Sequence, residues 1–419
     1  MARVSQTQNL ELLLPEGARL LHIGPQKTGT TALQMALHRN RQQLRELGVV
    51  VPGTGTRPRL AVWSLLGAPE GIRRPNIEHW HRLVHEVDEA ADLRVCVSTE
   101  DWARADLDGA KAVVEGLGGE RCHIVATARR LDRLLPSQWQ QRVKMRAISL
   151  TYEQWLEKVL GDDTEDAAWR NVWVPHDIEQ VVDRWTEAAG GRDRFTLVVA
   201  DESDHGLLPR TFEQMLGLPE GMLSAADTDK RNQSVSLSRI EVIRRLNELV
   251  ESRDWPDPFA TGDVRVRLNN HLKTSAPWPG EQRIPPLPPW AADRVAELSD
   301  HRAALVRSLD VRVIGDADNL RMPPIADEGR AEAETIVISA ELAARALEEV
   351  IEGAVELQKA AEERHAQQVA RLRAKLRKAR ARGGRDSAAV STAGGDDVSG
   401  RELIVALRGR ALRRMRRSR

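Results

Sequence analysis

Short apolar runs alternate with longer amphipathic stretches over the first three quarters of the chain. The runs are rich in Val, Leu and Ile, which is typical of strands buried on both faces of a parallel sheet. The stretches between them have the periodicity of helices that cover such a sheet. The expected strands lie at about 19–24, 47–51, 93–98, 122–128 and 195–200, and a last strand and turn at 310–320. We therefore predict an α/β domain over residues 19–322, with a parallel sheet between two layers of helices.

The pattern changes in the last quarter of the chain. We expect a long helix in 331–382, because from residue 334 onward this segment contains no proline and only one glycine and is rich in Ala, Glu, Leu, Lys and Arg. Its loosely spaced apolar residues predict a coiled coil and, weakly, a homo-oligomer. The Gly- and Ser-containing residues 383–400 predict a flexible linker, and 401–419 form a basic tail. Residues 1–18 are interpreted as an N-terminal extension.

Charge is unevenly distributed along the chain. The whole chain has 62 basic and 62 acidic residues, yet residues 364–419 carry 17 basic and four acidic residues. A tail of this kind, with apolar residues at 403–405 ahead of its arginines, suits an amphipathic helix on an anionic membrane surface. Nucleic acid is a less favoured partner, because few aromatic residues lie among the basic ones. A disordered solubilising tail is the alternative.

Neither end of the chain suggests passage through a membrane. There is no run of 18 apolar residues and no basic-then-apolar signal segment at the N-terminus. We therefore expect a cytoplasmic protein that associates peripherally with the inner membrane face through its tail. Cys96 and Cys122 fall in expected strands, where they are interpreted as small core residues. His79, His81 and His85 are expected on a solvated helix face, and we predict no metal site.

The most informative segment is 19–37, RLLHIGPQKTGTTALQMAL. An apolar run ends at Gly24, a loop containing glycine follows, and a helical pattern begins at about residue 30. This geometry cradles phosphate groups with backbone N–H groups and a helix start. The spacing of Gly24 and Gly29 fits the nucleotide-triphosphatase loop, but Thr30 stands where that loop has its lysine. The candidate phosphate-binding residues are Lys27, Thr28, Gly29, Thr30 and Thr31.

The loop PQKTGTT at 25–31 resembles the 5′-phosphosulfate loop of the sulfotransferases. These enzymes use 3′-phosphoadenosine 5′-phosphosulfate (PAPS) as sulfuryl donor. The resemblance extends over about 19–322 and implies a three-layer, P-loop-type sheet with PAPS as co-substrate. It also implies that Lys27 neutralises the 5′-phosphate leaving group during catalysis. Arginine far exceeds lysine in the chain, by 53 to 9, which indicates a GC-rich bacterial genome.

A second segment lies at 121–146, RCHIVATARRLDRLLPSQWQQRVKMR. Arg129 follows an apolar run, and Ser137 comes eight residues later on an expected helix. The resemblance assigns this pair to the 3′-phosphate of the donor, and the chemistry fits because a guanidinium fork takes two phosphate oxygens and a hydroxyl a third. Arg130 is the competing candidate, one residue too close to Ser137. The family's usual proline two residues after the arginine is Leu131 here.

The third segment, LRVCVSTEDW at 93–102, ends an expected central strand with Ser98, Thr99 and Glu100. Parallel sheets gather their active sites at this edge. Several sulfotransferase branches end this strand similarly, and the resemblance makes Glu100 the general base. The alternative is that Thr99 or Glu100 only caps the following helix. The other candidate bases are Asp101, His22 and His176.

The resemblance implies an enzyme that moves a sulfuryl group from PAPS to a hydroxyl acceptor by in-line displacement. A carbohydrate or glycolipid acceptor is favoured because of the tryptophans and the basic tail. One alternative is a nucleoside-triphosphate-dependent kinase of related architecture, which would need magnesium. The other is a non-catalytic scaffold that acts through the C-terminal helix and tail.

Overall fold

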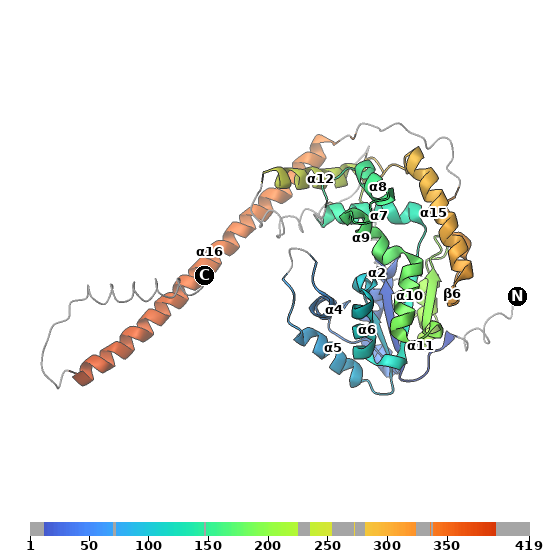
Figure 1. Ribbon diagram of the computed structural model, residues 1–419. Helices are drawn as coiled ribbons and strands as arrows, with labels where there is room; N and C mark the ends of the chain where they lie inside the picture. The colour runs from blue at the N-terminus through green and yellow to red at the C-terminus, as the bar shows by residue number, and fades with distance from the viewer. Residues whose placement is uncertain are drawn as a thin grey trace. The chain divides into compact units, whose positions relative to one another are not determined.

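Six strands form one sheet in the order β2-β3-β1-β4-β5-β6, and every neighbouring pair is parallel. The strands are β1 (Arg19–Gly24), β2 (Val49–Val50), β3 (Arg94–Ser98), β4 (Cys122–Ala128), β5 (Phe195–Val199) and β6 (Arg312–Ile314). The computed structural model describes residues 12–69, 73–145, 148–224, 235–253, 272, 281–323, 336 and 338–390. The predicted parallel α/β sheet is confirmed, and β1, where the glycine-containing loop starts, lies inside it (Figure 1).

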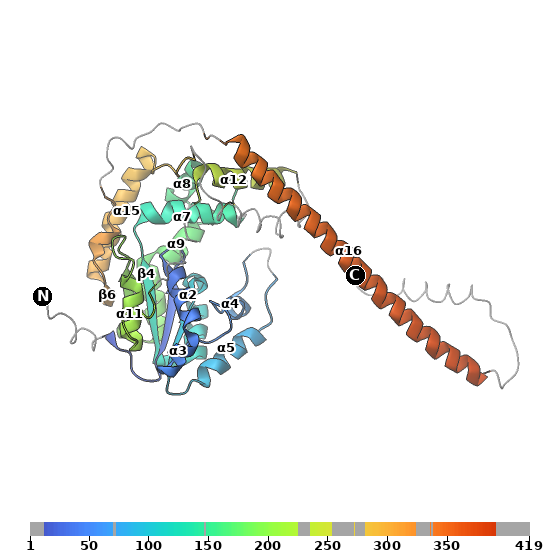
Figure 2. The ribbon, with the colours of Figure 1, turned by 180° about the vertical axis from the view of Figure 1, so that it is seen from behind.

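Each face of the sheet has its own layer of helices (Figures 1 and 2). Successive side chains of a strand point to opposite faces, so in β1 Leu21 and Ile23 pack into one layer and Leu20 into the other. The first layer contains α4 (Arg59–Leu66), α5 (Glu78–Asp88), α6 (Leu107–Leu117) and α10 (Ile178–Ala189), and the second contains α2 (Thr30–Arg39), α3 (Arg41–Glu46) and α11 (Leu207–Leu216). Cys96 and Cys122 are buried in β3 and β4, as expected.

A third hydrophobic cluster is made almost entirely by helices. Its helices are α7 (Leu131–Lys144), α8 (Tyr152–Leu160), α9 (Ala167–His176), α12 (Leu237–Ser252) and α15 (Pro289–Ser308). Trp139 and Trp155 are fully buried at its centre. Because α7 begins directly after β4, this cluster lies at the carboxyl end of the strands (Figure 1).

The bounds of the outer strands match the ranges expected from the sequence less closely than those of the inner strands. β6 and the short helix η5 (Ala317–Leu320) match the strand and turn expected at 310–320. β2 is only two residues long, within the run expected at 47–51, because only Val49 and Val50 pair with β3. Among the helices of the described residues, none combines the length and the apolar character needed to span a bilayer.

The long helix α16 (Ala340–Val390) begins later and ends later than the segment expected at 331–382. It continues through the first eight residues of the expected linker, since adding a residue to an existing helix gains one hydrogen bond for one residue fixed. Residues 391–400 of the linker and the basic tail at 401–419 lie outside the described residues. The chain divides into two compact units, 1–350 and 351–419. In the first unit, Leu342 and Ala346 of α16 are buried in the helical cluster.

A buried arginine fastens the start of β1 to the segment between α5 and β3. The Arg19 side chain is fully buried, and its guanidinium donates to four backbone carbonyl groups. These bonds reach Gly17 O at 2.9 Å, Leu93 O at 2.9 Å, Ala91 O at 3.0 Å and Val87 O at 3.3 Å. Buried carbonyl groups need partners, and Arg19 supplies donors to these four, of which Val87 O also accepts from the N–H of Ala90 at 3.3 Å.

Arg19→Met should therefore destabilise the fold strongly. Because the carbonyl groups would lose charged donors in a dry environment, we expect a loss of about 3–5 kcal/mol in the free energy of unfolding, measured by urea titration. The exposed neighbour Arg121 provides the control, and Arg121→Met should cost less than about 0.5 kcal/mol. A similar small loss for both variants would contradict this role of Arg19.

Candidate functional site

The loop between β1 and α2 has the backbone shape of a cradle. Lys27 has φ 69° and Gly29 has φ 89°, both in the left-handed region, so the chain curls sharply before α2. The Thr28 hydroxyl donates to Pro25 O at 2.7 Å, which ties the loop across itself. Lys27 is half-buried, and Gly29 and Thr31 are exposed at the mouth of the loop.

The N-terminus of α2 is left open to a ligand. Gly29 occupies the N-cap position, no side chain caps the helix, and its first turn contains no acidic residue. The first N–H groups of a helix have no partner inside the helix and carry partial positive charge. The loop therefore offers N–H groups and the charge of Lys27 to an anion.

Gly24 brings the end of β1 against the short helix η1 (Glu100–Arg104). Its φ is 83°, and a Cβ atom at this position would lie 2.8 Å from Glu100 Cβ and 2.9 Å from Glu100 Cα. Real Cβ atoms do not approach other atoms this closely. Only glycine lets the loop and the candidate base lie side by side.

Arg129, the first residue after β4, reaches the same loop. Its Nη1 donates to Lys27 O at 3.1 Å, because β1 and β4 are neighbours in the sheet. Its Nε and Nη2 donate to the two carboxylate oxygens of Glu202, at 2.5 and 2.9 Å. The backbone carbonyl of Arg129 in turn accepts from Arg302 Nη1 of α15, at 3.0 Å. The structure thus brings Lys27 and Arg129 together and adds Glu202, which the sequence reasoning missed.

Ser137 lies on α7, the helix that begins two residues after Arg129. It is half-buried, and its hydroxyl has no hydrogen-bond partner among the described residues. The next residue, Gln138, is buried and donates from Nε2 to Gln26 O in the loop, at 3.3 Å. This side chain was also missed, although a glutamine at the helical spacing set by Leu131, Leu134 and Leu135 is a usable signal.

The competing candidate Arg130 forms an ion pair on α7 instead. Its backbone occupies the N-cap position of α7, and its Nε lies 3.0 Å from an oxygen of Asp132. Leu131, which stands where a proline was expected, is fully buried as the first residue of α7.

Glu100 is held from two sides at the end of β3. Its Oε1 forms an ion pair with Arg57, and its Oε2 accepts from Gln34 Nε2 of α2 at 3.1 Å. The side chain is 12% exposed. The expected capping role belongs to Thr99, whose hydroxyl accepts from the N–H of Asp101. Arg57 lies seven residues beyond the end of β2, and Gln34 lies within α2, so neither stands directly at a strand end where the sequence pattern marks a site.

The alternative base Asp101 lies beside Glu100, at the rim of the same edge. Its carboxylate is 15% exposed and lies 3.8 Å from Arg59 Nε. Both carboxylates are thus partly accessible to solvent. Glu100 faces Arg57, which lies between β2 and α4, and Asp101 faces Arg59, the first residue of α4.

The two histidines proposed as alternative bases are buried. His22 Nδ1 lies 2.7 Å from Ser98 Oγ, and burial lowers its pKa to about 3. His176 Nε2 lies 2.8 Å from Gln138 Nε2, and burial together with the charges of nearby arginines holds its pKa well below the ordinary value. Both rings are therefore neutral at pH 7 and make contacts typical of structural histidines. Of the three histidines expected on a solvated helix face, His81 and His85 are exposed on α5, beside Glu78 and Glu89.

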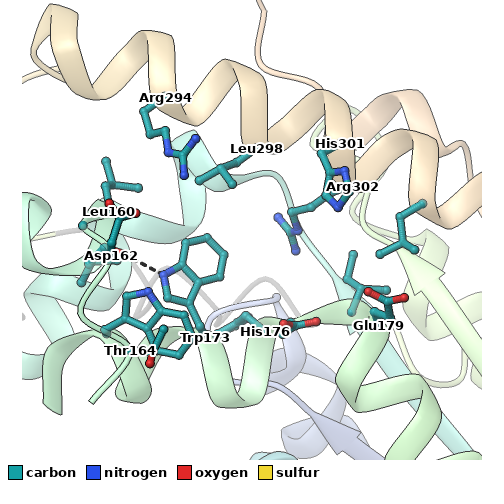
Figure 3. Close-up of a pocket in the computed structure, with 16 residues that line it drawn as sticks. Leu160, Asp162, Thr164, Trp173, His176, Glu179, Arg294, Leu298, His301 and Arg302 are labelled. Carbon is teal, nitrogen blue, oxygen red and sulfur yellow. Dashed lines mark hydrogen bonds between the residues drawn. The ribbon is translucent and has the colours of Figure 1, made fainter. Parts of the chain in front are cut away.

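A cavity of about 320 Å³ lies between α9 and α15 (Figure 3). Its walls include Trp169 and Trp173, and the Nε1 of Trp173 donates to Val159 O at 2.7 Å. Figure 3 shows Arg302 reaching from α15 toward His176 at the base of this cavity. Because Arg302 also holds the carbonyl of Arg129, the cavity wall and the candidate phosphate site share one side chain.

Comparison of the chain with protein-family models, with curated proteins and with solved structures found no match. The chemistry is therefore argued from the loop, from Arg129 and Glu100, and from their contacts.

The contact between Gly24 and Glu100 can be tested against a matched glycine. Gly24 and Gly29 both have positive φ, but a Cβ atom at Gly29 would meet no other atom within 4 Å. Gly29→Ala should cost about 1–2 kcal/mol of unfolding free energy through backbone strain alone. Gly24→Ala should cost about 3 kcal/mol or more, because η1 must also shift. Equal losses in urea titrations of the two variants would show that the contact is unimportant.

Proposed function

We propose that this protein is a sulfotransferase that moves a sulfuryl group from PAPS to a hydroxyl acceptor by in-line displacement. The observation that carries the proposal is the 3.1 Å hydrogen bond from Arg129 Nη1 to Lys27 O. Two segments about one hundred residues apart, each resembling one phosphate-binding segment of sulfotransferases, are in direct contact. A single adenosine bisphosphate has two phosphates that need such a pair of sites.

The loop would bind the 5′ side of the donor. Lys27 brings a full positive charge, and the uncapped start of α2 brings N–H groups from residues 29–31. The loop follows the first strand of a parallel sheet, which is the arrangement of P-loop-type folds. Sulfuryl transfer leaves negative charge on the 5′-phosphate, so fixed positive charge at this point lowers the barrier.

Arg129 and Ser137 would bind the 3′-phosphate. The guanidinium of Arg129 is only 23% exposed, and the strand end, Lys27 O and Arg302 fix its position. A guanidinium held in this way can donate hydrogen bonds to two phosphate oxygens in one plane. The Ser137 hydroxyl on the following helix would supply the donor for a third oxygen.

Glu100 would act as general base. It takes the proton of the acceptor hydroxyl as that oxygen attacks sulfur, while the bond from sulfur to the 5′-phosphate oxygen breaks and its electron pair leaves with the phosphate. Arg57 and Gln34 position the carboxylate at the end of β3. General-base assistance of this kind contributes roughly 10²–10⁴-fold to a rate. A carbohydrate or glycolipid hydroxyl remains the proposed acceptor.

One observation favours the second candidate, a nucleoside-triphosphate-dependent kinase. Glu202 occupies two donors of Arg129, and an acidic side chain at a strand end suits a ribose hydroxyl better than a phosphate. Such an enzyme would bind ATP with magnesium more tightly than a nucleotide with a 3′-phosphate. The nucleotide that the protein binds more tightly therefore distinguishes the two candidate functions.

Wild-type protein should bind 3′-phosphoadenosine 5′-phosphate in calorimetric titrations without magnesium. Lys27→Ala should weaken this binding about 10- to 100-fold, since a charge-assisted hydrogen bond is lost. Lys111→Ala is the matched control, because Lys111 is an exposed lysine on α6 that pairs with Glu187. If wild-type protein binds only ATP and magnesium, the sulfotransferase proposal is wrong.

Glu100→Gln should keep the affinity for 3′-phosphoadenosine 5′-phosphate within about twofold and lose roughly 10²–10⁴-fold in turnover. Turnover is measured as PAPS consumption with octyl glucoside, which offers sugar hydroxyls on an alkyl chain. Asp101→Asn makes the same change on the rival carboxylate and should retain most of the turnover. The reverse order of the two variants would assign the base to Asp101.

A further inference from the structure

The partner of Arg129 in this structure is an internal anion. Glu202 presents both carboxylate oxygens to Nε and Nη2 of Arg129, at 2.5 and 2.9 Å, which is the two-bond geometry by which arginine also binds phosphate. The two side chains are 23% and 28% exposed. The carboxylate therefore occupies the donors that the proposed function reserves for the 3′-phosphate.

The other charged side chains nearby form ion pairs with one another. Arg130 and Arg133 are paired with Asp132, at 3.0 and 3.8 Å, so Glu202 is the ion-pair partner of Arg129. Burial opposes ionisation of Glu202, but the bonds to Arg129 and the charges of Arg130 and Arg133 prevail and hold its pKa below the ordinary value. Glu202 is thus anionic at pH 7.

The backbone around Glu202 is fixed by turns on both sides. Asp201 Oδ1 accepts from the N–H of Ser203 at 2.8 Å, and Asp204 Oδ1 accepts from the N–H of Gly206 at 3.0 Å. Ala200, two residues before Glu202, donates its N–H to Ala128 O at 2.8 Å. Glu202 can therefore leave Arg129 by rotating its side chain toward solvent, but its backbone stays beside the site.

We propose that Glu202 is a specificity-determining residue whose carboxylate occupies the guanidinium of Arg129 until a ligand phosphate displaces it. The inference rests on the proposed function, because it takes Arg129 as the 3′-phosphate ligand. A carboxylate carries one negative charge, whereas a phosphate monoester carries between 1.5 and 2 at pH 7. A phosphate can therefore replace Glu202, and a hydroxyl or a singly charged anion cannot.

The displaced carboxylate stays in positively charged surroundings. Arg130 and Arg133 are paired with Asp132, but their charges still act on Glu202 and favour its ionised form. This residual attraction lowers the cost of breaking the ion pair with Arg129, because the carboxylate is 28% exposed and is solvated as it leaves. This arrangement makes Glu202 a selective barrier that the correct nucleotide can open.

Calorimetric titration of the full-length chain at pH 7 tests the proposal with two probes, 3′-phosphoadenosine 5′-phosphate and AMP. Glu202→Gln should bind the bisphosphate about tenfold more tightly than wild type, as expected when a charge-assisted competitor is removed. Its affinity for AMP should change less than about twofold, because AMP has no group for Arg129. Glu220→Gln removes the same charge from an exposed position after α11 and should change neither affinity.

A double variant separates competition from general charge effects. In an Arg129→Ala background, Glu202→Gln should no longer increase affinity for the bisphosphate, since the competed group is gone. If Glu202→Gln leaves this affinity unchanged or weakens it, Glu202 orients Arg129 and the proposal is wrong. If neither wild type nor Glu202→Gln binds the bisphosphate but both bind AMP, the proposed function fails first and the inference with it. Thermal unfolding midpoints check that each variant is folded, and Glu202→Ala is the second variant if Glu202→Gln is not.

Discussion

The parallel pairing of β1 with β3 on one side and β4 on the other is the constraint on which the candidate site depends. Parallel strands end at the same edge, so residues that follow them meet there although they are far apart in the sequence. Gly24 ends β1, Glu100 and Arg129 follow β3 and β4, and each touches the loop or its flank. Loss of the β1 register would separate all of them at once.

The inner strands could be predicted because they are buried on both faces and therefore read as unbroken apolar runs. β4 was expected at 122–128 and spans Cys122–Ala128. The positions of Lys27, Arg129 and Glu100 at strand ends follow from the same pattern. β2 and the end of α16 were less predictable, because an edge strand and a solvated helix have few burial constraints to mark their limits.

The partners of these residues could not be predicted. Arg129 pairs with Glu202, 73 positions later, and Glu100 pairs with Arg57, 43 positions earlier. Spacing along a strand says which residue stands at the edge, but the choice of ion-pair partner depends on how loops from other strands fold over that edge. Glu202 lies just after β5, so applying the strand-end rule to every strand would have raised it as a candidate, without revealing that it binds Arg129.

The bond from Arg302 to the carbonyl of Arg129 joins positions 173 residues apart. Chains emerge from the ribosome N-terminus first, and domains fold as their parts become available. The loop after β1 is among the first segments to emerge, but the backbone of Arg129 gains this support only after α15 has been synthesised. Nascent chains that stop before α15 thus carry the loop without the bond that holds the backbone of Arg129, so the candidate site is completed only once α15 has joined the fold.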